Sequence, residues 1–200
     1  MKIRIAHWIS LVALILLSAC GEVDYTPKPR LFPKVVFPEH DYKAFDANYC
    51  AFTFQQPTYT EIQQDTTFFE DRPKDPCWFD IVYPQFDTKL HCTYQPITKD
   101  KSLTDLVAES ITMVEEHVVK AEYIDEKAIR KADANLYGMT FDLEGPVATH
   151  FQFYLTDSSK HFLRGALYTY ARPNPDSLRP VVQFIKEDVY QMINTLEWNE

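Results

Sequence analysis

The residues of this chain with the clearest covalent chemistry lie near its N-terminus, in the motif Leu17-Ser18-Ala19-Cys20. They follow a basic start with Lys2 and Arg4 and an apolar stretch over residues 8–17, the three-part pattern of a secretion signal. A cysteine at this point is typical of a bacterial lipoprotein, in which cleavage frees the amine for acylation and the sulfur carries diacylglycerol. The apolar run is too short for the roughly 20 residues of a membrane span. We therefore expect residues 1–19 to be a signal peptide and Cys20 to be lipidated.

A second group of potentially reactive side chains lies close together in the sequence: Asp157, Ser158, Ser159 and His161. A Ser-His-Asp triad needs a nucleophile, a base and an orienting carboxylate in line, and residues of a single turn cannot adopt that arrangement. We predict instead a hairpin turn whose polar side chains cap its own backbone. The sequence therefore predicts no catalytic residues and a protein that is not an enzyme.

Arg164 is the charged member of an otherwise apolar set on the strand that follows this turn. We expect it to pair with Asp142 or Glu144 on a neighbouring strand. The alternative is an anchor for a binding partner, because arginine is favoured at the centres of protein interfaces. The candidate partner-binding residues are accordingly Asp157, Lys160, His161 and Arg164.

Cofactor sites have little support in this sequence. His150 and His161 could meet Asp142 or Glu144 across neighbouring strands, but their spacing matches no known metal-ligand pattern. The chain has only four glycines and no P-loop, GxGxxG or HExxH motif. We therefore predict neither a metal nor another cofactor.

The remaining three of the four cysteines indicate one disulfide. Disulfides persist in exported proteins, and an odd number of thiols leaves one unpaired. Cys50 and Cys77 each lie in phase with the apolar face of a predicted strand, so we predict that these two are bonded. Cys92 is in phase with Phe86 and Leu90, which suits a buried thiol that packs as a small apolar side chain.

Charge and length limit the classes of partner. The formal net charge is −9, and removal of Lys2 and Arg4 with the signal makes it more negative. Such a chain is unsuited to nucleic acid or to adsorption on anionic headgroups, so lipid on Cys20 must hold it at the membrane. We expect a lipid-anchored place in the cell envelope, exposed to the periplasm, and the residues after Cys20 leave inner and outer membrane both open.

The chain length allows one globular domain behind a tether. Residues 20–48 contain four prolines with little periodicity, which is typical of an extended tether, although apolar residues near its end favour packing on the domain or on a partner. We therefore divide the chain into signal peptide 1–19, tether 20–48 and domain 49–200.

Alternating apolar residues predict strands through most of the domain. Residues 77–83 and 86–94 form a predicted hairpin in which Trp78, Asp80 and Val82 point away from the Phe79 face. Residues 55–76 are mostly irregular, with one short strand near 59–63. Further strands are predicted over 136–143, 147–156 and 161–171. In the last hairpin we pair Thr156 with His161, which sets Phe153 opposite Arg164.

Two amphipathic helices complete the predicted elements. Ser102 begins the first, with Asp105 three residues later in the capping-box position. The second follows the break over residues 173–177 and has an apolar stripe from Leu178 to Leu196. The fold class is therefore α+β, a single domain with a mainly antiparallel sheet and two amphipathic helices. The order of elements resembles the Mog1/PsbP-like layout.

Longer segments carry a resemblance to a known family. They are Tyr137-Gly138-Met139, residues 152–168, residues 172–178, Thr195-Leu196-Glu197-Trp198, Cys77-Trp78-Phe79-Asp80-Ile81 and Tyr83-Pro84, behind the lipid signal. In this order the chain resembles the gliding motility lipoprotein GldD family over nearly the whole mature domain, with residues 55–76 as the unmatched part.

The resemblance implies a cell-envelope lipoprotein that gliding requires and that is associated with the type IX secretion machinery. On this basis we expect a non-enzymatic protein that acts by docking on, or assembling, protein components of the gliding and secretion apparatus. The alternative is an envelope carrier or sensor of a small ligand, with a pocket between sheet and helices, which the many aromatic residues would suit.

Overall fold

The computed structural model describes residues 34–45, 47–66, 75–170 and 175–199. The chain divides into two units, Met1–Lys34 and Val35–Glu200, and the strands and helices of the fold belong to the second unit. The predicted signal peptide and Cys20 lie outside the described residues. Neither α-helix in the described part of the chain combines the length and the apolar character that a membrane crossing needs.

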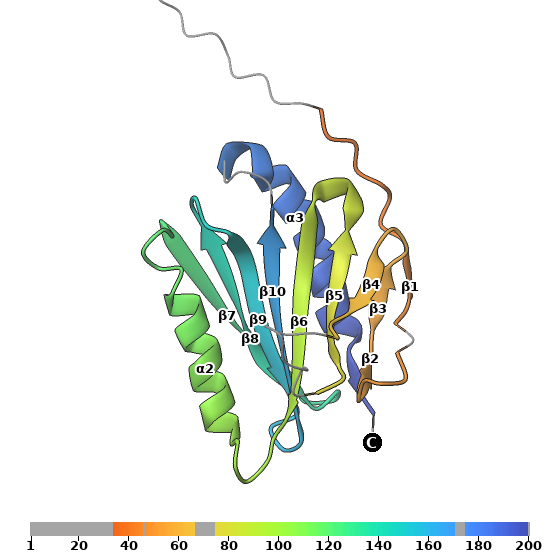
Figure 1. Ribbon diagram of the computed structural model, residues 1–200, viewed down its shortest axis with the longest axis vertical. Helices are drawn as coiled ribbons and strands as arrows, with labels where there is room; N and C mark the ends of the chain where they lie inside the picture. The colour runs from red at the N-terminus through yellow and green to blue at the C-terminus, as the bar shows by residue number, and fades with distance from the viewer. Residues whose placement is uncertain (1–33, 46, 67–74, 171–174, 200) are drawn as a thin grey trace, which may run out of the picture. The chain divides into compact units, whose positions relative to one another are not determined.

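A seven-stranded antiparallel sheet forms the centre of this unit (Figure 1). Its strand order is β4-β5-β6-β10-β9-β8-β7, and every neighbouring pair is antiparallel. The strands are β4 (Glu61–Gln64), β5 (Trp78–Tyr83), β6 (Thr88–Pro96), β7 (Tyr123–Lys131), β8 (Leu136–Glu144), β9 (Thr149–Thr156) and β10 (His161–Thr169). A 3-10 turn, η1 (Pro84–Phe86), joins β5 to β6. The α+β class and the antiparallel sheet are confirmed.

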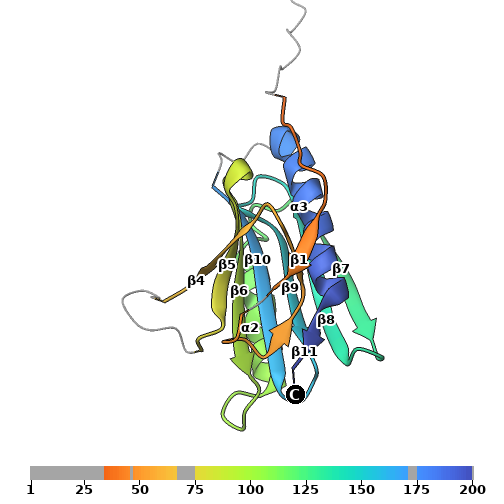
Figure 2. The same ribbon diagram turned by 90° about the vertical axis from the view of Figure 1, so that its right-hand side faces the viewer.

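The two α-helices cover opposite faces of the sheet. Figures 1 and 2 show α2 (Leu103–Glu115) on one face and α3 (Pro175–Thr195) on the other. Side chains alternate along a strand, so each strand contributes to both layers. On β10, for example, Leu163 and Leu167 join the core beneath α3, whereas Phe162 and Arg164 line the side toward α2.

The main hydrophobic core lies between α3 and the sheet. The apolar stripe of α3, with Ile185 and Val189 at its centre, lies in one core cluster with Phe151 of β9 and Leu163 of β10. Short strand pairs extend this layer: β1 (Tyr42–Ala44) pairs with β3 (Gln55–Pro57), and β2 (Phe52–Thr53) pairs with β11 (Glu197–Trp198). Four stacked or tilted phenylalanine rings fill the space beneath them: Phe45, Phe52, Phe54 and Phe79.

The helix α2 begins as predicted and covers a smaller core. Ser102 Oγ accepts from the Asp105 amide, and Asp105 Oδ2 accepts from the Ser102 amide, which completes the capping box. Val114 packs with Phe141, Leu143 and Val147. The helix ends at Glu115, and Val118 in the turn that follows is half exposed.

The globular unit starts earlier than residue 49. Phe37 packs against Phe184 of α3 at a ring separation of 4.9 Å, and residues 42–44 form β1. Phe45 is 3% exposed and stacks on Phe54. The globular domain therefore begins before residue 49, because Phe37 and Phe45 pack against α3 and the core.

The register of the β9–β10 hairpin differs from the prediction by one residue. Thr156 pairs with Phe162, and Phe153 pairs with Gly165 rather than with Arg164. The loop holds one more residue than predicted, because the Asp157 carboxylate accepts from the amides of Ser159, Lys160 and His161. A shift of one residue moves a side chain to the other face of the sheet. Arg164 therefore faces α2 and not the main core.

The strand β7 was not predicted. It forms an edge of the sheet, and most of its residues are exposed or half-buried. An edge strand exposed in this way carries too little apolar alternation to stand out in a sequence. The short strand expected near 59–63 is present as β4.

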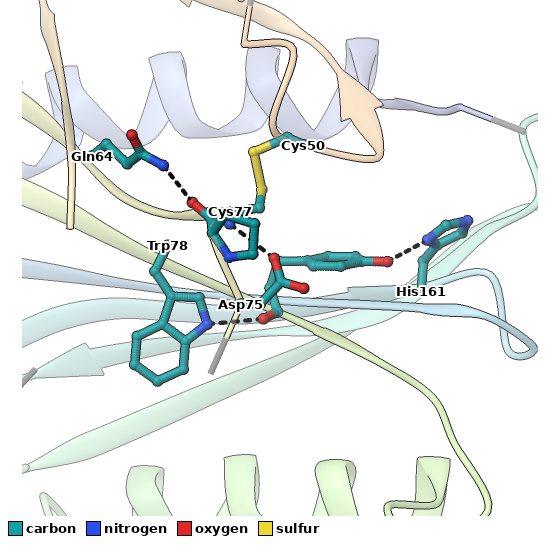
Figure 3. Close-up of a disulfide and its surroundings, with 8 residues drawn as sticks. Cys50, Gln64, Asp75, Cys77, Trp78 and His161 are labelled. Atoms are coloured by element: carbon teal, nitrogen blue, oxygen red, sulfur yellow. Dashed lines mark hydrogen bonds between the residues drawn. A yellow bond between two sulfur atoms is a disulfide. The ribbon is translucent and has the colours of Figure 1, made fainter. Parts of the chain in front are cut away.

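The predicted disulfide between Cys50 and Cys77 is present, with the two Cα atoms 5.0 Å apart (Figure 3). It ties the segment before β2 to the start of β5. Nearby, Gln64 Nε2 donates to the Pro76 carbonyl, and the Cys77 amide donates to Asp75 Oδ1. Cys92 is a buried free thiol, as predicted, and burial raises its pKa.

Candidate functional site

The polar turn between β9 and β10 is built around Asp157, which is 7% exposed. Its Oδ1 accepts from the backbone amides of Ser159, Lys160 and His161 at 2.8–2.9 Å, and its Oδ2 accepts from Ser159 Oγ at 2.7 Å. Burial opposes the charge of Asp157, but these hydrogen bonds outweigh it and lower the pKa to about 2. The carboxylate and the Ser159 hydroxyl thus serve the turn itself, as the sequence predicted.

His161 is held from two sides. Its Nδ1 lies 2.7 Å from the Tyr94 hydroxyl, and its ring stacks on Trp198 with centroids 5.1 Å apart. Figure 3 marks the hydrogen bond at His161 with a dashed line. Burial lowers the pKa of His161, so its neutral form is favoured. The histidine therefore packs the end of the sheet. Ser158, Ser159 and Lys160 are the exposed residues of this turn, and Lys160 is the charged one among them.

Arg164 lies apart from the other three predicted partner-binding residues, on the face toward α2. The expected pairing with Asp142 or Glu144 is wrong. Asp142 binds Lys186 of α3, whereas Arg164 Nη2 donates to Gln152 Oε1 at 2.5 Å. The cause is the hairpin register, which turns Arg164 away from the face that carries Asp142. The four residues do not form one patch.

Arg164 instead lines a cavity of about 430 Å³ between α2 and strands β5, β6 and β10. Apolar walls come from Trp78, Phe162, Leu106 and Met113. The volume is within the range of roughly 300–1,000 Å³ that small-molecule sites occupy. In Figure 1, α2 stands over the β7 side of the sheet, so no α-helix in the described part of the chain covers β5 and β6 on this face.

One side of this cavity is an ion-pair cluster centred on Asp80. Lys89 Nζ lies 3.1 Å from Asp80 Oδ2, and His91 Nδ1 lies 2.6 Å from Asp80 Oδ1. Burial alone would raise the pKa of Asp80, but His91 and Lys89 together hold it below its ordinary value. The charge of Asp80 is therefore matched within the cluster.

A second cluster surrounds the buried carboxylate of Asp188 on α3. Tyr59 donates to both carboxylate oxygens at 2.7 and 2.9 Å, Tyr42 donates to Oδ1 at 3.0 Å, and His40 Nδ1 lies 2.8 Å away. Burial raises the pKa of Asp188, and the three partners offset part of this rise. The arrangement joins the first residues of the globular unit to α3.

Sequence reasoning placed Trp78 and Asp80 on the face away from Phe79 but assigned them no function. The alternation of residues 78–82 and 89–95 is the signal that sets these side chains on one face. No sequence pattern predicts that α2 lies beside β5, β6 and β10, and the cavity forms only because the helix supplies one of its walls. Among the described residues, no three His, Cys, Asp or Glu side chains gather as a metal site.

Comparison with known proteins supplies the family. No curated protein matches the chain. The solved structures include a similar one, the solution structure of cyanobacterial PsbP (CyanoP) from Synechocystis, with 14% identity and a TM-score of 0.48, covering 92% of this chain and 99% of that one.

A family model described as gliding motility lipoprotein GldD matches residues 22–198, nearly the whole chain after Cys20. That family carries a role in gliding motility and a lipid-anchored place in the cell envelope. The chain belongs to the gliding motility lipoprotein GldD family.

Proposed function

We propose that this protein is a non-enzymatic lipoprotein that supports gliding by binding protein components of the gliding and type IX secretion machinery. The observation that carries the proposal is the family match over residues 22–198 directly behind the lipidation motif at Cys20. Lipid on Cys20 holds the protein at the membrane, and the globular unit faces the periplasm. The use of Asp157 and Ser159 in turn hydrogen bonds supports a role without catalysis.

The end of the sheet beside Lys160 is the docking face in this proposal. A polar hollow there is lined by residues of both charges, including Asp133, Lys160 and Glu197. Trp198 borders it, and within the described part of the chain its buried indole Nε1 has no hydrogen-bond partner. Tryptophan beside a polar rim is common at the energetic centre of protein interfaces.

The test is crosslinking of the tagged protein in its native envelope, with partners identified by mass spectrometry and gliding scored on a surface. Wild type should capture gliding or secretion components, and the membrane fraction that holds them identifies the membrane. Cys20→Ser and Lys160→Glu should each lose these partners and reduce gliding. Lys120→Glu, the same charge reversal in the exposed turn after α2, is the matched control and should behave as wild type.

Two results would overturn the proposal. One is full gliding and unchanged partners in the Cys20→Ser strain, which would remove the need for an anchor. The other is turnover of a cell-wall or lipid substrate by the purified protein that a point substitution abolishes.

The cavity between α2 and the sheet favours a second candidate function, the carrying or sensing of a small ligand. Its volume and its apolar walls with a few polar groups are those of a ligand site. Native mass spectrometry of the protein taken from its own host should then show a bound molecule. Protein that is free of ligand in every preparation would contradict this function.

A further inference from the structure

We propose that the cavity between α2 and the sheet binds a small amphipathic carboxylate, with its carboxylate on Arg164 and its apolar body against Trp78 and Phe162. This inference deepens the second candidate function and rests on it. Three features of the cavity carry it: the way in which Arg164 is held, the state of its charge, and the apolar character of the walls.

Arg164 is fixed from behind by a buried amide. Its Nη2 donates to Oε1 of Gln152, which is 1% exposed and itself donates through Nε2 to Thr149 Oγ1 at 3.2 Å. A guanidinium has five N–H donors in a planar fork, and this contact uses one nitrogen. The remaining donors are available on a side chain whose position is already set, so a ligand would lose little entropy in ordering it.

The charge of Arg164 is not matched by an ion pair. In residues 34–45, 47–66, 75–170 and 175–199, no carboxylate lies within the 4.0 Å ion-pair distance of its guanidinium. Two acidic residues line the same cavity, but Asp80 pairs with Lys89 and His91, and Glu109 binds Lys101. Burial lowers the pKa of Arg164, with Tyr168 and Glu116 offsetting part of this effect. An anion beside the guanidinium would compensate this desolvated charge.

The walls of the cavity determine the rest of the ligand. Trp78, Phe162 and Leu106 are 6%, 2% and 1% exposed, and Met113 of α2 borders the same space. Thr93 pairs with Trp78 on one side and with Arg164 on the other, so these three side chains form one row across β5, β6 and β10. An apolar body along this row would replace water against Trp78 while its head reaches Arg164.

A single carboxylate fits this site better than a phosphate or a peptide strand. One guanidinium matches one carboxylate in a bidentate pair. The second charge of a phosphate would need another cation, and Lys89 is already bound to Asp80. A volume of about 430 Å³ is that of a small-molecule site rather than of a long peptide groove.

The test uses residues 21–200 made without lipid or detergent, because the core and the disulfide lie wholly within 35–200. Calorimetric titration compares dodecanoate with dodecanol, which has the same chain length and no charge. Wild type should bind dodecanoate at least about tenfold more tightly, as a charge-assisted hydrogen bond predicts. Arg164→Gln should lose this preference. Lys43→Gln, which removes a cation from the exposed strand β1, should keep it.

A fluorescence measurement keeps the inference testable if Arg164→Gln does not fold. Residues 21–200 contain two tryptophans, Trp78 in the cavity and Trp198 beside His161. In a Trp198→Phe background, dodecanoate should therefore change the emission of Trp78, and dodecanol at the same concentration should change it less.

Each contrary result has a distinct meaning. Equal affinity for dodecanoate and dodecanol, or an unchanged affinity of Arg164→Gln for dodecanoate, would overturn the proposal that the ligand is a carboxylate. The cavity would then be a site for an apolar ligand. Binding of an apolar peptide with a free C-terminal carboxylate but not of dodecanoate would overturn the small ligand. Failure of both probes to bind, with no molecule found on protein from the host, would overturn the inference and the ligand function together.

Discussion

Asp157 shows how residues that suggest chemistry in a sequence can be taken up by local structure. Its carboxylate accepts three backbone amides and one hydroxyl within its own turn. Ser158 in the same turn has a φ of 67°, a left-handed conformation that residues other than glycine, asparagine and aspartate seldom adopt. The turn is therefore strained at one residue and stabilised by the hydrogen bonds of another.

Replacing Asp157 should cost stability that depends on pH. Asp157→Ala should lower the free energy of unfolding at pH 7 by about 2 kcal/mol, the scale of hydrogen bonds to a charged group. Because the pKa of Asp157 is lowered to about 2 in the folded protein, against about 3.9 when unfolded, this contribution is present in full above about pH 5. It should diminish as the pH falls from about 4 toward 2.

Urea unfolding from pH 7 to 3 measures this difference. The exposed Asp100, changed to alanine, is the control and should show neither the loss at pH 7 nor the trend with pH. A difference between wild type and Asp157→Ala that stays constant down to pH 3 would contradict the assigned role of the carboxylate.

Asp188 is the other carboxylate that the structure buries and surrounds with donors. Asp188→Ala should lower the free energy of unfolding by about 1–3 kcal/mol, because the hydroxyls of Tyr42 and Tyr59 lose their acceptor in a half-buried site. Glu187→Ala is the matched control. It also removes a partner of His40, but Glu187 is 70% exposed, and an exposed pair contributes less than about 1 kcal/mol. Equal losses for the two variants in denaturant unfolding would contradict this account.

At the scale of elements, the disulfide joins two segments that are 27 residues apart in the chain. Cys50→Ser or Cys77→Ser should lower the free energy of unfolding by about 2–4 kcal/mol, mainly because the unfolded chain gains freedom. Thermal unfolding with and without a reductant should show the same effect in wild type. In the Cys50→Ser, Cys77→Ser double variant the reductant should have no effect, since Cys92 forms no disulfide. Equal melting temperatures for oxidised and reduced wild type would refute the prediction.

The register of the β9–β10 hairpin depends on a contact between strands. Phe153 pairs with Gly165, and a Cβ atom at residue 165 would lie 2.2 Å from the Phe153 ring. Glycine is therefore required where this ring crosses the neighbouring strand. The predicted register set Phe153 opposite Arg164. Both faces of β10 are apolar, with Phe162 and Ala166 on one and Leu163 and Leu167 on the other, so alternation did not select between two registers that differ by one residue.

At the scale of the whole molecule, the globular unit includes residues that the sequence assigned to a tether. A chain that begins at residue 49 loses Phe37 and Phe45, which pack on α3 and in the core. Its free energy of unfolding should be lower than that of residues 35–200 by at least about 3 kcal/mol, the usual cost of removing a buried phenylalanine. A chain that begins at residue 21 should match residues 35–200. If calorimetry gave equal stability for the chains that begin at residues 21, 35 and 49, residues 35–48 would belong to the tether as the sequence predicted.

The two faces of the sheet differ in how completely they are covered. The face toward α3 carries the main core, which the N-terminal strands complete. The face toward α2 has a smaller core near β8 and the cavity near β5, β6 and β10. The face toward α3 is thus the fully packed one, and the candidate ligand site lies on the less fully covered face toward α2.

The sequence by itself determined the family, the fold class, the disulfide partners and the capped start of α2, and it predicts the lipid signal, which lies outside the described residues. Each of these depends on residues close in the chain or on a period of alternation, which local rules describe. Tertiary structure alone decided the face that each helix covers, the partner of Arg164, the cluster at Asp188 and the cavity. Each of these depends on contacts between segments that are far apart in the chain, such as the contact of His40 with Asp188. Local sequence patterns do not predict which distant segments come together.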